Sequence, residues 1–453
     1  MENVNAPEFD VDQLEELIRE HKMLDARKLL IEINEVDLAD ILSQLPEDQL
    51  PIAFRILPKE TAADVFAYFD SDKQKALIRA FSDKELYFIM DNLFLDDTVD
   101  MIEEMPASVV KRILKNTDPQ TRNEINELLK YPEDSAGSIM TPEYIRLQEN
   151  MTVQEAFDRI RKEGTDKETI YTCYVTNAKR ELIGIVTVKE LLLSSYETKV
   201  RDIMETNILY VHTLDDQEQV VKAFDKYNFI ALPVVDKEER LVGIITFDDA
   251  IDVIQEENTE DIEVMNAIMP SDKTYMKTGA FETFKKRIPW LLILMISATF
   301  TGAIISHYEA ALGAYVILTA YIPMLMDTGG NAGSQASVSV IRAISLDEVH
   351  FSDIFRVQGK EFFVSLLCGV SLAATSFLKL LFIDRVGVTI ALVVCCTLLC
   401  AIIVAKFVGC SLPILAKKVG FDPAVMSSPF ITTIVDAVSL LIYFQIASRV
   451  LHI

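Results

Sequence analysis

The chain has 453 residues, half of them hydrophobic, and a formal net charge of −26 at neutral pH. This charge is unevenly distributed, because residues 1–284 carry −29 and residues 285–453 carry +3. An acidic soluble part followed by a membrane part explains how half of the residues can be hydrophobic in a chain of such high negative charge. The length also exceeds that of one ordinary domain. The acidic part would repel phosphates, which argues against nucleic acid as a partner and favours divalent cations, with simple solubility as the alternative.

Cysteine usage and the N-terminus indicate a cytoplasmic setting for the acidic part. Of six cysteines only Cys173 precedes the apolar segments, and the sequence has no CxxC pair. The N-terminal stretch MENVNAPEFDVDQ has neither a basic region nor an apolar core, so we expect no signal peptide.

Residues 10–129 show a helical pattern divided by short loops. Segments such as FRILPKETAADV and IRAFSDKELYFIM place Pro, Ser or Asp before an acidic first turn, which is typical of helix starts. The short, irregular spacing predicts an all-α helical solenoid over residues 1–133. Asp96, Asp97 and Asp100 cluster at one helix start, where the simplest explanation is compensation of the helix dipole.

Two similar segments follow, spaced by about 60 residues. ETIYTCYVTNAKRELIGIVTVKELLL and FIALPVVDKEERLVGIITFDDAIDVI each predict a strand, a turn, a strand and a helix. Each copy is preceded by an apolar helix, so residues 134–261 are expected to form an α/β tandem repeat. The repeat resembles a pair of CBS domains.

The CBS resemblance implies candidate nucleotide contacts, with ATP as the candidate ligand. CBS pairs carry a G-h-h-T-x-x-D pattern that contacts ribose, and the second copy keeps Thr246 and Asp249. The first copy has Thr187 but places Glu190 in the acidic position. The same residues would also cap the following helices, and the sequence does not decide between the two interpretations.

The second repeat ends in a helix with a dense acidic face. Its members are Asp248, Asp249, Asp252, Glu256, Glu257, Glu260 and Asp261. No lysine relieves the repulsion before Asp272, which favours a visiting cation. A polar linker helix is expected over residues 262–284, ahead of a basic cluster at Lys285–Arg287.

Five apolar segments are each long enough to cross a membrane. They span residues 288–306, 312–344, 362–382, 388–415 and 423–450. Residues 285–453 therefore predict a five-helix transmembrane domain. Basic residues gather before the first segment and in the second and fourth connections, which favours a cytoplasmic N-terminus and an external C-terminus.

Two of these segments carry polar residues on one helical face. Asp327, Asn331, Gln335 and Ser339 recur every fourth position, as do Ser428, Thr432 and Asp436, with Ser439 three residues later. A carboxylate facing lipid costs roughly 2.5–3.5 kcal/mol, so such faces are expected to line a path for ions. The alternatives are a helix–helix seam for the first face and a protonated, buried carboxyl for Asp436. Carboxylate, amide and hydroxyl oxygens suit Mg²⁺.

At these residues the sequence resembles a known family. PMLMDTGGNAGSQ followed by IRAI, and FDPAVMSSP followed by TTIVDA, are similar to the two pore helices of the bacterial MgtE magnesium channels and transporters. The resemblance covers essentially the whole chain. It implies a magnesium-selective pore in the bacterial plasma membrane, closed when intracellular Mg²⁺ binds the acidic N-terminal and CBS domains. We expect a homodimer in the lipid bilayer, with both chains lining the path.

The resemblance also implies site residues. Asp436 is expected to hold partly hydrated Mg²⁺, with Asp327, Asn331, Thr432 and Asp422 as secondary candidates in the pore domain. The positions that match regulatory Mg²⁺ ligands of the family are Asp96, Asp100, Asp216, Glu218, Asp249, Asp252, Glu257, Glu260 and Asp261. Asn228 stands where the family tends to Asp, so the site at that position should be weaker or absent.

Two other functions fit part of the pattern. Asp327-Thr328-Gly329 matches the aspartic protease tripeptide, with Asp436 as a partner carboxylate. The chain has no second D-T-G, so we expect no enzymatic activity. A proton- or sodium-coupled divalent cation transporter is the nearer alternative, because intramembrane carboxylates can carry protons.

Overall fold

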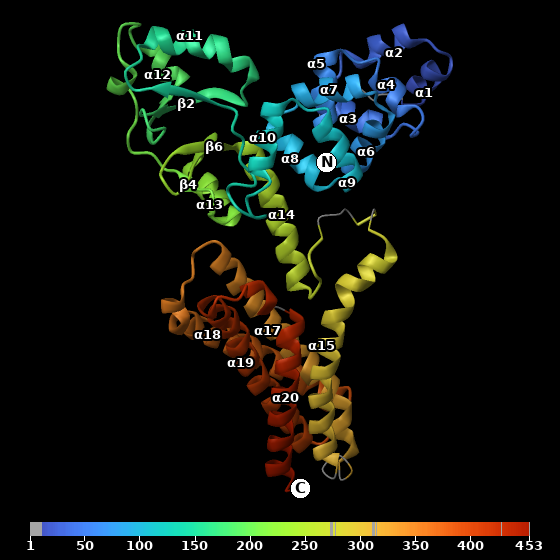
Figure 1. Cartoon of the computed structure of the whole chain (residues 1–453). Coiled ribbons are helices and arrows are strands. Elements are labelled where there is room, and N and C mark those ends of the chain that lie inside the picture. Colours follow the sequence, from blue (N-terminus) through green and yellow to red (C-terminus); the bar gives the residue numbers. More distant parts are fainter. Residues whose placement is uncertain are drawn as a thin grey trace. The chain divides into compact units, whose positions relative to one another are not determined.

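The structure is a computed structural model that describes residues 11–271, 275–276, 278–309, 313, 315–426 and 428–452. The chain divides into two compact units, Met1–Ile254 and Gln255–Ile453 (Figure 1). The sequence predicts an external C-terminus at Ile453, and this residue lies outside the described residues.

Short helices build the first half of the first unit, as predicted. They are α1 (Val11–Arg19), α2 (Met23–Leu30), α3 (Glu35–Ser43), α4 (Leu50–Phe54), α5 (Lys59–Ala67), α6 (Ser71–Ala80), α7 (Asp83–Asn92), α8 (Leu95–Glu103), α9 (Ala107–Lys115) and α10 (Pro119–Leu128). Local capping sets their starts. Ser82 and Glu85 form a capping box on α7, and Asp70 and Asp118 accept backbone N–H groups at α6 and α10. The predicted all-α domain is confirmed.

Two three-stranded sheets follow, one for each sequence repeat. The first repeat contains β1 (Tyr144–Gln148), α11 (Val153–Glu163), β2 (Thr169–Thr176), β3 (Leu182–Thr187) and α12 (Val188–Leu193). The second contains β4 (Val211–His212), α13 (Gln217–Tyr227), β5 (Ala231–Val235), β6 (Leu241–Thr246) and α14 (Phe247–Met265). In both sheets the first strand pairs parallel to the second, and the second pairs antiparallel to the third.

The two repeats also share a close approach of a strand glycine to a methionine side chain. A Cβ atom on Gly184 would lie 2.5 Å from Sδ of Met204, and one on Gly243 would lie 2.6 Å from Sδ of Met140. The same pair of residue types therefore meets at the same strand of each repeat. The predicted α/β tandem repeat is confirmed.

The helical domain and the second repeat share one hydrophobic core. Leu95 and Ile102 of α8 belong to the same buried cluster as Phe224, Leu232 and Ile245 of the second repeat. The first repeat has a core of its own. The boundary predicted near residue 133 marks a change in the sequence pattern. The hydrophobic core nevertheless continues across this boundary and packs α8 against the second repeat.

The predicted linker helix over residues 262–284 is interrupted. Helix α14 ends at Met265, and residues 266–271 contain turns and no helix. Ala267 has a positive φ of 55°, and Pro270 has no backbone N–H to donate, so neither residue continues an α-helix. The prediction of one continuous linker helix is therefore wrong over this stretch.

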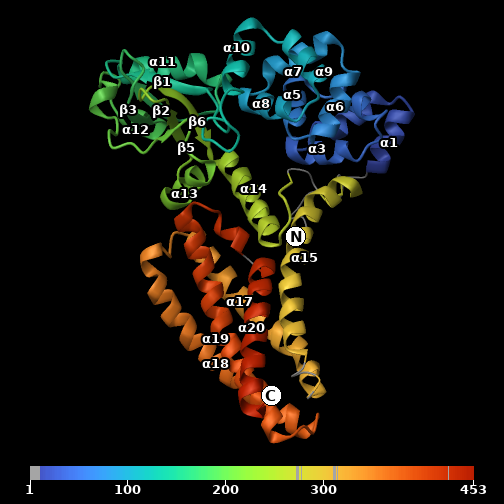
Figure 2. The same cartoon turned by 60° about the horizontal axis from the view of Figure 1, so that its bottom comes forward.

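Five long helices follow the end of α14 in the described part of the second unit. They are α15 (Ala280–His307), α17 (Ile322–Ser345), α18 (Ile354–Phe382), α19 (Val388–Val419) and α20 (Ser428–Leu451), with short 3-10 helices at η3 (Val316–Tyr321), η4 (Phe351–Asp353) and η5 (Pro423–Met426). Figures 1 and 2 both show α17, α19 and α20 packed side by side. The predicted five-helix domain is confirmed.

Helix α17 differs from the other four in composition. Of the described helices, α15, α18, α19 and α20 lie in segments that are long and apolar enough to cross a membrane. Helix α17 is 24 residues long but has the polar residues of its predicted face within that length. Because of these polar residues, a search for long apolar helices does not identify α17 as a membrane span.

Candidate functional site

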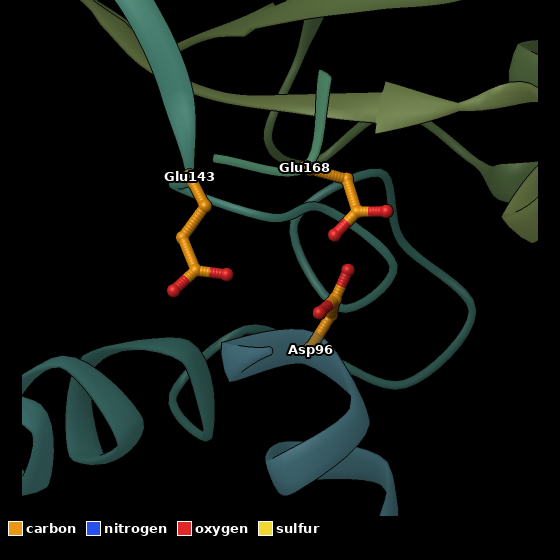
Figure 3. Close-up of side chains that lie close together, drawn as sticks. All are labelled: Asp96, Glu143 and Glu168. Carbon is orange, nitrogen blue, oxygen red and sulfur yellow. The ribbon is translucent and has the colours of Figure 1, made fainter. Parts of the chain in front are cut away.

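Three carboxylates from distant parts of the sequence meet in the first unit. Asp96 lies at the start of α8, Glu143 precedes β1, and Glu168 precedes β2. One oxygen from each side chain lies within 4.8 Å of the others. Figure 3 shows the three carboxyl groups pointing toward a common centre. We call Asp96, Glu143 and Glu168 the carboxylate cluster.

The parallel pairing of β1 with β2 brings the two glutamates together. Tyr144 pairs with Thr169, so the residues before them, Glu143 and Glu168, stand next to each other. The backbone N–H of Glu168 donates to the carbonyl of Glu143 at 2.9 Å. The side chain of Glu143 also accepts from the backbone N–H of Leu95 at 3.3 Å. This bond attaches the N-terminus of α8 to the first sheet and places Asp96 beside the glutamates.

Like charges and burial destabilise the ionised form of the cluster. Burial is the main cause that raises the pKa of Glu168 to about 8 and the pKa of Glu143 to about 7. Burial, followed by the charges of Asp249 and Asp97, raises the pKa of Asp96 well above its ordinary value. The buried Oε2 atom of Glu168 has no hydrogen-bond partner. A bound cation would supply that partner and offset the repulsion.

Further acidic residues surround the cluster on α8 and α14. Burial, followed by the charges of Asp249 and Asp248, raises the pKa of Asp97 to about 6. Burial also raises the pKa of Asp249 and of Asp252. Asp249 is held by Thr246, whose hydroxyl donates to its carboxylate at 2.5 Å. The first turn of α14 therefore adds negative charge to the cluster.

The donor set of the cluster fits a hard divalent cation. Three carboxylates offer oxygen ligands, and no thiol or imidazole belongs to the group. Mg²⁺ takes oxygen ligands at about 2.0–2.1 Å and keeps several of its waters, so three carboxylates with solvent access can hold it. Zn²⁺ would favour nitrogen or sulfur ligands.

Two predicted regulatory residues on α13 have other partners. Asp216 caps the helix by accepting from the backbone N–H of Glu218 at 2.9 Å. Glu218 forms an ion pair with Lys222 at 2.8 Å. Asn228 ends the same helix with a left-handed φ of 54°, a conformation that asparagine tolerates.

The other predicted regulatory residues lie along two helices. Asp100 is exposed on α8, one turn beyond Asp96. Glu257, Glu260 and Asp261 lie on the part of α14 that belongs to the second unit. Within the first unit the structure therefore brings Asp96 close to Asp249, whereas Asp100 is not part of the carboxylate cluster.

The candidate nucleotide contacts form helix caps in both repeats. Thr187 accepts from the backbone N–H of Glu190 at 3.2 Å, and Glu190 accepts from the backbone N–H of Thr187 at 2.7 Å. Asp249 accepts from the backbone N–H of Thr246 at 3.4 Å at the start of α14. Capping contacts are thus present in both repeats, and they neither support nor exclude a nucleotide contact.

In the second unit, α17 leaves its predicted polar face at the surface. The exposed residues of that face are Asp327, Asn331, Gln335 and Ser339. The buried face consists mostly of small residues, including Gly329, Gly330, Ala332, Gly333 and Ala336. A helix surrounded by lipid would have the opposite arrangement, with its apolar side chains outward. The polar face of α17 therefore requires water or another polar surface.

Small residues let α17 approach α20 closely. A Cβ atom on Gly330 would lie 2.9 Å from Cγ2 of Thr432, so a larger residue at this position would push the helices apart. The hydroxyl of Ser428 donates to the hydroxyl of Ser334 at 2.9 Å. The two polar faces predicted from the sequence thus belong to neighbouring helices.

Asp436 is the half-buried carboxylate of α20. It lies close enough to Asp327 for the two charges to interact. The hydroxyl of Thr432, one turn earlier, donates to the carbonyl of Pro429 at 3.0 Å. Asp422 is exposed and accepts from the backbone N–H of Ala424 at 2.7 Å, which makes it a cap of η5.

Sequence reasoning missed three groups that the structure singles out. Glu143 and Glu168 each stand alone beside an apolar strand, and only the strand register brings them together. Lys406 of α19 pairs with Glu361 of α18 at 3.2 Å. Its signal was visible, since a single lysine interrupts an otherwise apolar segment.

These features define a class: a multi-pass membrane protein joined to an acidic unit of short helices and a CBS pair. The MgtE model, described as a divalent cation transporter, matches residues 322–446. The MgtE intracellular N domain matches residues 33–134, and the CBS domain matches residues 136–197 and 200–256. The "Magnesium transporter MgtE" of Thermus thermophilus is 36% identical over 449 residues, which cover 97% of this chain and 98% of that protein. The chain belongs to the MgtE family.

Other relatives agree with this placement. The "Magnesium transporter MgtE" of Bacillus subtilis is 32% identical over 440 residues, 96% of each chain. A crystal structure of the cytosolic domain of the Mg²⁺ channel MgtE in complex with ATP has a TM-score of 0.51 and 36% identity, and covers 54% of this chain and 100% of that chain. The soluble part of a magnesium transporter has a TM-score of 0.51 and 28% identity, and covers 55% and 97%.

Proposed function

We propose that this protein is a magnesium-selective channel or transporter for Mg²⁺ uptake, closed by Mg²⁺ that binds its acidic first unit. The observation that carries the proposal is the exposed polar face of α17 beside Asp436, within a membrane unit. Relatives that match nearly the whole chain are named magnesium transporters. That family is one of transporters, which supports a function without enzymatic activity.

The path would use few charged ligands. Asp436 would hold partly hydrated Mg²⁺ through its waters, and the oxygens of Asp327, Asn331 and Thr432 would contact the remaining water shell. One Asp436 carboxylate from each chain attracts the ion but holds it weakly enough for release, which conduction requires. Several carboxylates there would slow release.

A second copy of the chain is the partner that suits α17. Four polar residues exposed on a membrane helix need a water-filled surface, and two copies of one face related by two-fold symmetry enclose such a path. We therefore propose a homodimer in the bacterial plasma membrane. The distribution of basic residues in the sequence supports a cytoplasmic N-terminus.

Regulation would begin at the carboxylate cluster. Mg²⁺ held by Asp96, Glu143 and Glu168 would join α8 to the first repeat and remove the repulsion among the surrounding acids. Helix α14 carries Asp249 in its first turn and continues as one helix into the second unit. A change at its first turn would therefore act on the same helix as far as Met265, within the second unit.

The CBS pair would also bind ATP. The support is the ATP complex of a similar cytosolic domain. Thr187, Glu190, Thr246 and Asp249 are the candidate contacts, although each also takes part in a helix cap.

Flux measurements on purified protein in proteoliposomes test the proposal. A channel should pass Mg²⁺ down its own gradient without a proton or sodium gradient. Flux that requires either gradient would favour the coupled transporter, which the proximity of Asp327 and Asp436 would then explain. Cysteine in place of Gln335, in a background without the native cysteines, should cross-link two chains if the polar faces meet.

A further inference from the structure

An ion pair lies in the membrane unit on two helices that do not carry the polar faces. The ammonium of Lys406 on α19 contacts Glu361 on α18 at 3.2 Å, and the side chains are only 6% and 13% exposed. Both helices are long and apolar enough to cross a membrane. Pairing reduces the desolvation penalty of such charges but seldom makes them more stabilising than an apolar pair of similar size. Stability alone therefore does not explain these two residues.

A second polar contact joins the same two helices. The amide of Gln358 on α18 donates to the hydroxyl of Ser411 on α19 at 2.9 Å. Gln358 precedes Glu361 by three residues, and Ser411 follows Lys406 by five, so the antiparallel helices are matched at two points about one turn apart. Directional contacts at two points fix both the rotation of α18 against α19 and the sliding of one helix along the other. Apolar packing alone would also permit neighbouring registers of the two helices. We call these two contacts the polar clamp.

The polar clamp lies beside the closest approach of α19 to α17. A Cβ atom on Gly409 would lie 2.2 Å from the carbonyl oxygen of Gly333, and one on Gly333 would lie 3.1 Å from the carbonyl oxygen of Ala405, the neighbour of Lys406. The same Cβ on Gly333 would lie 2.9 Å from Cγ2 of Ile431 on α20. With no side chain between the backbones, a shift of α19 is passed directly to α17.

We propose that the polar clamp positions α17 so that its exposed polar face discriminates Mg²⁺ from other cations. This inference rests on the proposed function, in which α17 lines the ion path. Lys406 and Glu361 act as positioning residues through α19 and do not contact the ion. Selectivity depends on the spacing of oxygen ligands, so a displacement of α17 alters selectivity as well as rate.

Two double variants test the role of the charges. Lys406→Met with Glu361→Gln removes both charges at similar side-chain length and leaves no unpaired ion. At matched amounts of folded, reconstituted protein, its Mg²⁺ flux should fall about tenfold and its permeability for Mg²⁺ relative to Na⁺ at least about twofold. Lys406→Glu with Glu361→Lys rebuilds the pair and should recover both values to within about twofold of the wild type. Ser411→Ala keeps both charges and should show a smaller loss of selectivity.

A measurement independent of transport separates this inference from the proposed function. Spin labels at Ser339 on α17 and Leu415 on α19, both exposed, report the distance between the helices in a cysteine-free background. The distance distribution should broaden in the neutral double variant and narrow again in the charge-swapped one.

Three results would overturn the clamp. The first is a neutral double variant with the wild-type Mg²⁺/Na⁺ permeability ratio and the wild-type width of the distance distribution. The second is a charge-swapped variant that recovers neither value relative to the neutral variant. The third applies where neither double variant folds, and it is a Ser411→Ala variant with wild-type values of both. Wild-type protein that passes no Mg²⁺ would contradict the proposed function, while the distance measurement would still decide the clamp.

Discussion

The two units of this protein place their carboxylates in opposite ways. In the first unit, Asp96, Glu143 and Glu168 bring their oxygens within 4.8 Å of one another, and further acids surround them. In the second unit, Asp436 has one acidic neighbour, Asp327, among hydroxyl and amide groups. A site that detects Mg²⁺ benefits from many carboxylates, because repulsion in its absence makes the bound state differ strongly from the free one. A path benefits from few, because the ion must leave.

The largest expected effect follows from removing the carboxylate of the path. Asp436→Asn keeps the shape and hydrogen bonding of the side chain but deletes its charge, so Mg²⁺ flux should fall about a hundredfold at matched expression. Asp436→Glu should retain part of the flux, since the charge survives while the geometry shifts. Uptake assays in proteoliposomes measure both.

The control for this variant is Asp347→Asn, which removes an exposed carboxylate of the second unit that pairs with Lys417 at 3.7 Å. It should remain within about twofold of wild-type flux, because an exposed ion pair contributes little to stability. Wild-type Mg²⁺ uptake by Asp436→Asn would contradict the assignment of Asp436 to the ion path and leave it as a helix–helix contact.

The second effect concerns the carboxylate cluster. Glu168→Gln removes one of three ligands and the raised-pKa carboxyl, so the Mg²⁺ concentration that protects the first unit from trypsin should rise about tenfold. The matched control is Glu127→Gln, an exposed glutamate paired with Lys130 that should leave the midpoint nearly unchanged. Equal midpoints in both variants would mean that the cluster is not the binding site.

The third effect is a pH dependence of the same midpoint. The pKa of Glu168 is raised from its ordinary 4.5 to about 8, and that of Glu143 to about 7, so protons compete with Mg²⁺ near neutral pH. Raising the pH from 6 to 8 should therefore lower the Mg²⁺ midpoint about tenfold. Trypsin protection at pH 6, 7 and 8 measures it, and Glu168→Gln should flatten the trend.

The same shifts fix the sign for stability without Mg²⁺. A carboxyl with a raised folded pKa adds no penalty below about pH 4.5, where the unfolded group is also protonated. Above that pH the unfolded groups are ionised while the folded groups stay protonated, so the penalty grows with pH and levels off once the pH passes about 7 for Glu143 and about 8 for Glu168. The Mg²⁺-free first unit should accordingly lose stability between about pH 4.5 and pH 8, and added Mg²⁺ should restore it.

The smallest expected effect separates nucleotide binding from capping. Thr187→Val removes the side-chain cap of α12, at a cost of about 1 kcal/mol in stability, and Thr246→Val removes the hydroxyl that donates to Asp249. If Thr246 also contacts the nucleotide, its replacement should weaken ATP binding several-fold more than that of Thr187, as measured by calorimetry on the full protein. Equal, small losses in ATP affinity would leave both hydroxyls with a local structural role only.

Much of the fold was predictable because its signals are local. Ser82 with Glu85 marks a helix start, the repeated strand–turn–strand pattern marks each sheet, and the spacing from Asp327 to Ser339 marks one face of a helix. The carboxylate cluster was not predictable in full, because Glu143 and Glu168 become neighbours only through the register of two parallel strands. The break in the linker depends on Ala267 and Pro270, which the charge pattern around them obscured.

The polar contacts within the membrane unit show a different limit. Lys406 was visible in the sequence as an exception within an apolar segment, but its partner Glu361 lies 45 residues earlier on another helix. Helix pairing decides such contacts, and one sequence carries no direct signal for it.

The most direct test of the account is Mg²⁺ flux through reconstituted protein as the Mg²⁺ concentration on the side of the first unit is raised. The wild type should close over the millimolar range, because the carboxylate cluster fills. Asp96→Asn with Glu168→Gln should conduct equally well at low Mg²⁺ but stay open at concentrations that close the wild type. Closure of this variant at the wild-type concentration would contradict the division between a sensor with many carboxylates and a path with few.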